Sequence, residues 1–336
     1  MKAFKKILLC ILVIVSVVLI NTTSWSQGSD IETVQFTDGT VVTGVVVEIN
    51  NEIIRIKTDD GTIVTRKFND IAAVMDEKEV KALAASNETG TLFIPKHTFQ
   101  IGPEISYIKY SESSLNVEET GVMYGIDASY AYHDGVMLKG EVGYSFGYMD
   151  YKGSGEADNI EDTLLEMRVL AGYDFFLNPA SVITPYVGFG YRHLSDNGGG
   201  KLTSTGYAGY DRKTQYYYIP VGIRTNNDAG NGWSWGITAE FDYFCKGKQT
   251  SCLSDVDPGY NDVENKQKDG HGFRGSFIVQ KKGETISYSI EPFIRYWKID
   301  NSEIETITYY GVPTGLYLLE PQNNSTQFGI MLTVMF

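Results

Sequence analysis

The last ten residues of the chain, 327–336, alternate between large apolar side chains and all others. Because successive side chains of a β-strand point to opposite faces, this segment predicts a strand with one wholly apolar face. A strand that contacts hydrocarbon on one side and lines a crowded interior on the other has this pattern. The chain is therefore expected to cross a membrane with strands. The residues expected on the apolar face are Phe328, Ile330, Leu332, Val334 and Phe336.

The N-terminus predicts a secretory signal peptide. Lys2, Lys5 and Lys6 precede an apolar run over 7–20, and small residues stand before Gln27, where cleavage is expected. A transmembrane anchor is the alternative, but the run is shorter than the roughly 20 apolar residues that a helical span needs. No later stretch of the sequence reaches that length. A membrane protein without such a helix has to be a closed barrel, since open backbone cannot be satisfied in lipid.

The chain is acidic overall. Its formal net charge is −14, and removing a signal peptide with three lysines and no acid gives −17. This charge argues against nucleic-acid partners, which require a basic surface. Glycine (35 residues) and tyrosine (23 residues) are abundant. Glycine relieves crowding inside a barrel, and tyrosine is favoured where a membrane meets water, so both fit the expected class.

Two cysteines, Cys245 and Cys252, remain after the signal peptide is removed. An even pair in an oxidising compartment favours a disulfide, which would close a small outer loop. Two free thiols are the alternative, because only geometry decides whether a bridge can form.

A small β-module is expected between the signal peptide and the barrel. Short alternating stretches run from residue 34 to residue 74, and Asp38-Gly39 and Asp60-Gly61 separate them as turns. Four or five strands are predicted. Asp38-Gly39-Thr40 followed by Thr43-Gly44-Val45 resembles the first hairpin of SH3-like or LSm-like barrels, which implies a soluble periplasmic adaptor. Charges at i,i+4 spacing predict a short helix over 76–86.

Ten further alternating segments follow, each long enough for a tilted membrane crossing of about 9–11 residues. Their connections alternate between short turns and long polar loops, the long ones lying near 111–120, 152–161, 195–213, 247–270 and 300–325. Outer-membrane barrels place short turns in the periplasm and long loops outside. An even strand count then puts Phe336 and the β-module on the periplasmic side. The strands are expected at 97–110, 121–132, 136–151, 162–177, 181–194, 214–225, 232–246, 271–281, 284–299 and 326–336.

The expected fold class is therefore all-β: a ten-stranded antiparallel transmembrane β-barrel preceded by a small periplasmic β-module. Four segments make up the chain: a signal peptide at 1–26, the SH3/LSm-like module at 27–76, a helical and extended linker at 77–95, and the barrel at 96–336.

Parity assigns each barrel residue to one of two faces. The lipid face is expected to carry Leu138, Val142, Tyr144, Phe146, Tyr148, Leu165, Met167, Val169, Ala171, Tyr173, Ile183, Val187, Phe189 and Tyr191. Fourteen charges share the other parity, and since a lone Arg or Lys facing lipid at mid-membrane costs about 2–4 kcal/mol, they define the inward face. These are Glu104, Asp127, Lys139, Glu141, Glu166, Arg168, Asp174, Arg192, Arg224, Glu240, Asp242, Arg274, Glu291 and Arg295.

This charged interior has two possible interpretations. A ten-stranded barrel is only slightly wider than an eight-stranded one, which side chains just fill. A plug of paired charges that makes the barrel rigid is the favoured interpretation. A narrow polar passage for small solutes or ions is the alternative, and it needs water to run continuously between the charges.

Residues 96–336 resemble the outer-membrane β-barrel proteins related to small opacity and surface-antigen barrels. The Gly-aromatic strands 187–192, 216–224 and 291–297 carry the resemblance, and terminal Phe336 resembles the sorting signal of Gram-negative barrels. It implies an outer-membrane location with a periplasmic N-terminal module. It also implies contact with outer-membrane lipid and lipopolysaccharide, the barrel assembly machinery during insertion, and an extracellular ligand at the loops. The family includes adhesins, stabilising barrels and pores, so the resemblance implies no single activity.

Catalysis is not expected, although a rim-located hydrolase of omptin or lipid-modifying type is the second alternative. His193 and His271 lie near the outer rim, but their parity points them away from the lumen. Glu240 and Asp242 point inward and are expected near the top of strand seven, where a carboxylate pair could do acid–base work if one pKa were raised. No His–Asp pair matches the omptin pattern. No catalytic, cofactor or metal residue is predicted.

Two acidic clusters are expected in outer loops, where solvation is the ordinary state of such charges. Divalent ions that bridge these loops to lipid phosphates are an alternative, because hard oxygen ligands at this density can hold Ca²⁺ or Mg²⁺. The expected role of the protein as a whole is structural, surface-interacting or envelope-related. The clusters are Glu156, Asp158, Glu161 and Asp162, and Asp255, Asp257, Asp262 and Glu264.

Overall fold

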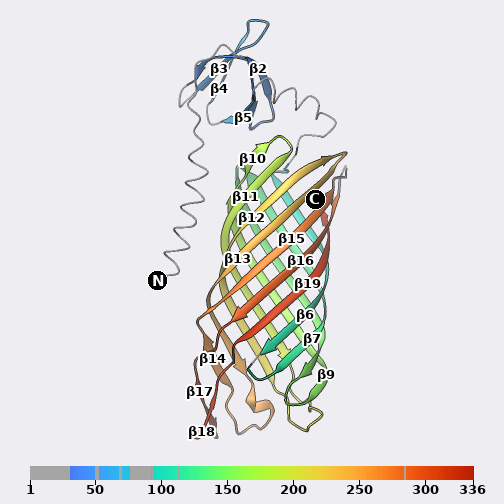
Figure 1. The fold of residues 1–336 in the computed structure, drawn as a ribbon, viewed down its shortest axis with the longest axis vertical. Coiled ribbons are helices and arrows are strands. Elements are labelled where there is room, and N and C mark those ends of the chain that lie inside the picture. Colours follow the sequence, from blue (N-terminus) through green and yellow to red (C-terminus); the bar gives the residue numbers. More distant parts are fainter. Residues whose placement is uncertain are drawn as a thin grey trace. The chain divides into compact units, whose positions relative to one another are not determined.

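The computed structural model describes residues 31–49, 53–67, 70–75, 92, 94–112, 114–283 and 285–336. The chain divides into two compact units, Met1–Ala85 and Ser86–Phe336 (Figure 1). The predicted signal peptide and the predicted helix over 76–86 lie outside the described residues.

The first unit contains one antiparallel sheet, with five strands in its described part. Val34, Phe36 and Ile54 are fully buried and form its core with Val42 and Ile56. Gly39 takes a left-handed φ of +82° in the first turn, and the Asp38 carboxylate accepts a 2.9 Å hydrogen bond from the Thr40 N–H. The resemblance to SH3-like and LSm-like barrels stays a prediction. The strand order is β4 (Ile63–Lys67), β3 (Ile53–Lys57), β2 (Val41–Ile49), β1 (Ile31–Phe36) and β5 (Ile71–Met75).

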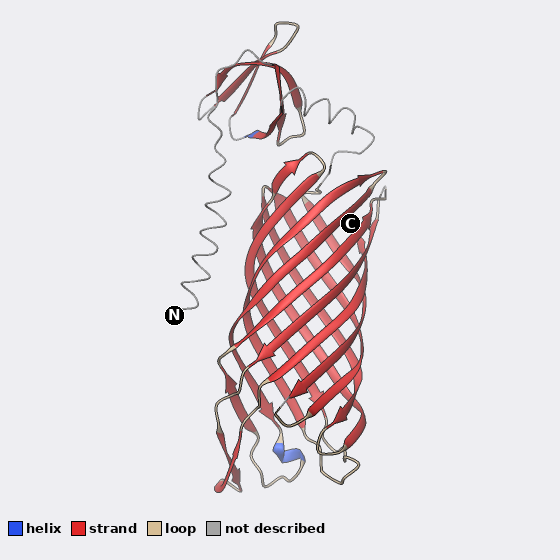
Figure 2. Cartoon of the chain, in the orientation of Figure 1, coloured by secondary structure: helices blue, strands red, loops and turns tan. Residues whose placement is uncertain are grey.

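The second unit is a closed antiparallel barrel of ten long strands within the described residues, which confirms the predicted fold class (Figure 2). The last strand closes the ring by pairing with the first, placing Phe328 opposite Tyr107 and Met335 opposite Gln100. Closure leaves no unpaired edge, which is what lets strands cross lipid. The strands are β6 (His97–Glu112), β7 (Val117–Asp134), β8 (Val136–Lys152), β9 (Glu156–Tyr173), β11 (Ser181–Asn197), β12 (Asp211–Gly230), β13 (Trp233–Ser251), β15 (Gly270–Lys281), β16 (Ser287–Ile299) and β19 (Asn323–Met335).

One end of the barrel, called here the short-turn end, carries tight connections and the C-terminus. Gly135 alone separates β7 from β8, and its φ of +71° allows that reversal. Phe336 is held there by paired backbone hydrogen bonds with Phe99, at 2.9 and 3.2 Å. The short strand β10 (Phe175–Asn178) continues β9 into the turn before β11.

The opposite, long-loop end carries connections over 198–210, 252–269 and 300–322. For two of the five connections, the prediction of a long loop is wrong. β6 continues to Glu112 and β7 begins at Val117, so residues 113–116 alone connect them. Residues 153–155 alone connect β8 to β9. The strands extend further than expected because their outer ends are polar and resemble loops. The predicted acidic loop at 156–162 is therefore part of β9.

The two faces of the strands differ as parity predicts. The residues expected to face lipid are exposed or half-exposed, with Val169 and Tyr148 among the most exposed large side chains of the barrel. Within the described residues, no helix is both long and apolar enough to span a membrane.

The predicted disulfide is wrong: Cys245 and Cys252 are both free thiols. Cys245 occupies a bulge of β13, where Phe244 and Lys246 pair with consecutive residues of β12. The chain then stays extended to Ser251, so the two cysteines stand roughly 20 Å apart along the strand. A disulfide requires Cα atoms within about 7 Å.

Candidate functional site in the barrel lumen

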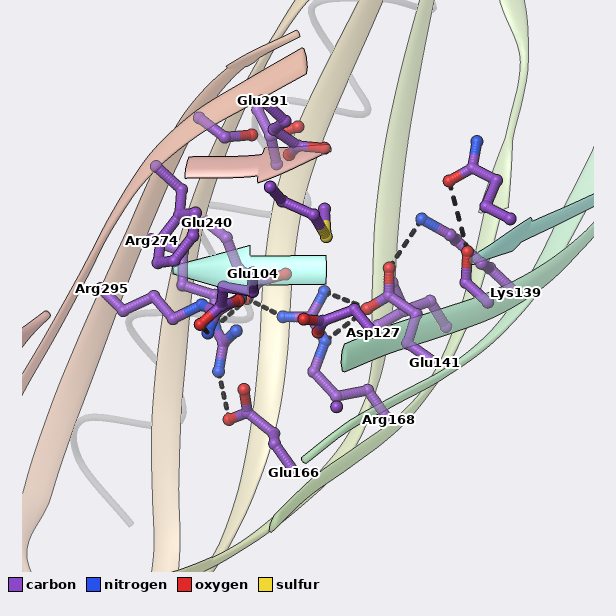
Figure 3. Close-up of a pocket in the computed structure, with 18 of the residues that line it drawn as sticks. Glu104, Asp127, Lys139, Glu141, Glu166, Arg168, Glu240, Arg274, Glu291 and Arg295 are labelled. Carbon is purple, nitrogen blue, oxygen red and sulfur yellow. Dashed lines mark hydrogen bonds and ion pairs between the residues drawn. The ribbon is translucent and has the colours of Figure 1, made fainter. Parts of the chain in front are cut away.

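A central layer of ion pairs crosses the lumen at mid-barrel (Figure 3). Arg168 on β9 donates to the Glu141 carboxylate of β8 at 2.6 Å and to the Glu240 carboxylate of β13 at 2.6 Å. Arg274 on β15 contacts Glu240 at 3.1 Å, Asp242 at 3.2 Å and Glu166. One guanidinium thus joins strands on opposite sides of the ring, which alternation alone cannot show.

Further groups complete this layer. Arg295 donates to Glu104 at 3.0 Å, and the Gln327 amide donates to the same carboxylate at 3.2 Å. Lys139 contacts the Glu141 carboxylate at 2.6 Å. The hydroxyl of Tyr186 donates to Glu240 Oε2 at 2.8 Å. Burial of charge is costly unless partners replace water, and here each of these carboxylates accepts at least two contacts.

The structure places all fourteen predicted lumenal charges inside the barrel. Asp174 lies toward the short-turn end, Arg192 lies toward the loops, and Asp242 sits beneath Arg274. The other eleven line a cavity of about 140 Å³: Glu104, Asp127, Lys139, Glu141, Glu166, Arg168, Arg224, Glu240, Arg274, Glu291 and Arg295.

Glu240 and Asp242 do not lie near the top of the barrel, contrary to expectation. Both are almost fully buried in the ion-pair layer and contact Arg274. The strand extends nine residues beyond Asp242, to Ser251, so its midpoint was mistaken for its outer end.

Two apolar clusters, together called the seal, lie in the lumen between the central cavity and the loops. One half comes from β12, β13 and β16, and the other from β6, β7, β8 and β9. The two halves face each other across a cavity of about 30 Å³, which Ile108, Met149 and Tyr216 line together with polar side chains that include Glu119, Asp162 and Arg192. All members are at most 8 % exposed: Tyr216, Tyr218, Phe244, Trp297 and Ile299 in one half, and Ile108, Met123, Met149, Ile160 and Leu164 in the other.

A second ionic cluster, which the sequence interpretation missed, lies on the loop side of the seal. Arg212 contacts Glu119 at 2.5 Å, Asp196 at 2.7 Å and Glu112 at 3.4 Å. The Tyr110 hydroxyl lies within hydrogen-bond distance of both Glu112, at 2.8 Å, and Glu320 in the loop before β19, at 3.0 Å. The signal was present, because Glu112 and Asp196 continue the parity of Glu104 and Arg192.

The histidines fall into two groups. His193 and His271 point outward beside aromatic rings, His193 stacking on Tyr191. His133 instead faces the lumen at the short-turn end, where its Nδ1 lies 2.6 Å from Asp174 Oδ2. In the described part of the chain no group of three or more His, Cys, Asp or Glu side chains is arranged to hold a metal ion.

The lumen and the closed ring define the class of protein: a membrane barrel with ionic interior layers. Residues 80–267 match the outer membrane protein beta-barrel domain, so the chain belongs to that family. No curated protein matches the chain.

Solved structures show similar barrels at low identity. Outer membrane protease OmpT from Escherichia coli is 9% identical, with a TM-score of 0.48, over 74% of this chain and 99% of that one. Neisserial surface protein A is 15% identical, with a TM-score of 0.27, over 71% and 97%. The Ralstonia pickettii toluene transporter TbuX is 8% identical, with a TM-score of 0.31, over 72% and 90%. At such identities these likenesses carry no activity to this chain.

Proposed function

We propose that this protein is a non-conducting, non-catalytic outer-membrane barrel that acts through its long-loop end, as a surface-interacting or envelope-supporting protein. The observation that carries the proposal is the seal. Its ten apolar and aromatic side chains come from seven strands, and three of them, Ile108, Met149 and Tyr216, face one another across a cavity of about 30 Å³. That volume holds only a few water molecules, whereas conduction requires a continuous file of water.

The ion-pair layers on either side of the seal favour rigidity over permeation. Arg168, Arg274 and Arg212 each hold two or more carboxylates from different strands. A cation passing through would have to displace these contacts. The alternative of a narrow channel therefore has less support than a plug.

A rim hydrolase also has little support. The carboxylates suggested for acid–base work, Glu240 and Asp242, lie beneath the seal and are engaged by Arg274. Neither can meet a substrate that approaches from the loops.

The long-loop end is built as an organised surface, which supports an interaction role. β14 (Val263–Gln267) extends the sheet by pairing with β13. The Asn265 amide donates to the backbone carbonyls of Glu303 and Leu318, at 2.9 and 3.0 Å. This ties the 252–269 loop to the hairpin of β17 (Glu305–Tyr309) and β18 (Val312–Leu318). Ordered loops on a rigid scaffold are where binding residues concentrate.

The hairpin also has an unusual surface for so acidic a chain. Residues 306–319 contain no charged side chain. Tyr310, Val312, Leu316 and Tyr317 are exposed there. Because outer-membrane barrels place long loops outside and short turns in the periplasm, this hairpin is proposed to face the extracellular side. The N-terminal unit then belongs to the periplasm.

Two measurements test the proposal. Liposomes that contain the purified barrel should retain a trapped small solute as well as empty liposomes do. Replacement of 306–317 by a short Gly-Asn turn should leave the barrel folded and reduce attachment of intact cells to surfaces or to other cells. Rapid solute release, or unchanged attachment, would contradict the corresponding half of the proposal.

A further inference from the structure

A chamber of about 510 Å³ occupies the short-turn end of the lumen, on the far side of the seal from the loops. Its walls combine apolar side chains with a larger number of polar and charged ones, among them Asp174, Asp228 and Lys282, and the turn residues Gly232 and Gly283 also line it. Leu92, Ile94 and Pro95 border it, and the Leu92 N–H donates a 2.9 Å hydrogen bond to the Pro179 carbonyl. A volume of roughly 300–1,000 Å³ is typical of small-molecule sites.

Arg224 stands where this chamber meets the central cavity of about 140 Å³. Gln100, Met137, Lys139 and Arg224 line both. Lys139 is neutralised by Glu141 at 2.6 Å. The guanidinium of Arg224 therefore supplies the available positive charge at this junction.

Arg224 differs from every other arginine of the barrel. The remaining five each have a carboxylate within 4.0 Å: Arg168, Arg192, Arg212, Arg274 and Arg295. Among the described residues, no side chain makes an ion pair or hydrogen bond with the Arg224 guanidinium. Five planar N–H donors thus face a cavity without a protein acceptor.

The nearby carboxylates do not serve as acceptors for the Arg224 guanidinium. Thr184 lies directly across the ladder from Arg224 and donates to Asp174 Oδ1 at 2.6 Å, while Asp174 Oδ2 contacts His133. Both oxygens of that carboxylate are thus in use. Asp228 is four residues further along β12, roughly 13 Å along the strand. Glu291 lines the central cavity and forms no ion pair with Arg224 within the described structure.

We propose that this chamber binds a small organic anion, with its carboxylate or phosphate head on Arg224 and an apolar body against the chamber wall. Guanidinium pairs with either oxyanion through two parallel N–H···O bonds, which a lone ammonium cannot reproduce. Leu92, Ile94, Met137 and Val182 supply the apolar wall. Because the seal closes the other side, the anion enters and leaves through the short-turn end and is not passed to the loops.

Binding to the full mature chain in lipid nanodiscs tests the proposal by calorimetry, with Trp233 emission as a second readout because Trp233 lines the chamber. The probes are hexanoate, hexyl phosphate and the neutral hexanol. Both anions should bind saturably and hexanol should not, and the tighter anion identifies the preferred head group. Arg224→Gln should weaken anion binding at least about tenfold.

Two further variants keep the test decisive. Lys246→Gln removes the same charge from an outward position over the Tyr217 ring and should leave binding unchanged. Arg224→Lys keeps the charge but loses the paired donors, so it should bind several-fold more weakly than wild type even if Arg224→Gln fails to fold. Absence of saturable binding, equal binding of hexanol, or wild-type affinity in either Arg224 variant would overturn the proposal.

Discussion

Tyr218 and Trp297 pack edge to face inside the lumen, with ring centroids 5.0 Å apart. Both side chains are essentially inaccessible to solvent. The hydroxyl of Tyr218 donates to Glu166 Oε1 at 2.8 Å, so the same residue belongs to the seal and to the central ion-pair layer. Aromatic pairs of this geometry contribute about 0.5–1.5 kcal/mol beyond the area they bury. The seal and the ionic layer are therefore expected to stabilise each other.

Removing only the hydroxyl separates these two contributions. Tyr218→Phe keeps the ring against Trp297 but withdraws one donor from Glu166, which retains Arg274. We expect a loss of about 1–2 kcal/mol in the free energy of unfolding. Urea titration in lipid vesicles measures it, with outward-facing Tyr144→Phe as the control. A Tyr218→Phe variant as stable as the control would show that this hydrogen bond contributes nothing.

Loss of one partner of a central ion pair should destabilise the barrel more than loss of both partners. Arg168→Met leaves Glu141 with Lys139 alone and withdraws a 2.6 Å contact from Glu240, and we expect it to cost about 3 kcal/mol. Adding Glu240→Gln should restore part of that loss, because the buried carboxylate that lost its contact with Arg168 is then replaced by a neutral group. Unfolding free energies of the two single variants and the double variant give the coupling. Strict additivity would contradict the described layer.

Glu320 makes stability depend on pH. Burial raises the pKa of Glu320 to about 7; the Arg212 charge opposes this rise and the Glu112 carboxylate adds to it. The folded chain thus holds a proton that the unfolded chain releases near its ordinary pKa of 4.5. Its contribution to stability is complete below about pH 4.5 and is lost as pH rises toward 7, by at most roughly 3 kcal/mol.

Glu320→Gln checks this assignment. The variant should flatten the fall in unfolding free energy between pH 4.5 and 7, and it should be more stable than wild type at pH 8. Glu305→Gln, in the exposed hairpin, serves as the control. An unchanged pH profile in Glu320→Gln would assign the dependence to other groups.

The number of free thiols tests the positions of the two cysteines. Because β13 holds Cys245 and Cys252 far apart, the mature protein should show two reactive thiols when it is denatured without a reductant. In the folded protein Cys245 should react faster, since it is exposed whereas Cys252 is buried. A thiol titration that finds none in the unreduced protein would require a different path for 245–252.

Much of the barrel could be predicted because a period of two is a strong signal when one face meets lipid. The strand count, the closure through β19 and the inward direction of Glu104 or Arg295 all depend on that period. The cluster around Arg212 was missed because the strands continue beyond the apolar zone, where their polar ends resemble loops. The seal could not be predicted, since Ile108 and Trp297 lie 189 positions apart and only the register of the strands brings them to one level.

Single-channel recording in planar bilayers tests the central claim most directly. The wild-type barrel should give no discrete current steps. The double variant Tyr218→Ala, Trp297→Ala should open a water path through the seal and give steps, provided that circular dichroism shows an intact barrel. Steps from the wild type of the same size as those from the variant would contradict a sealed lumen.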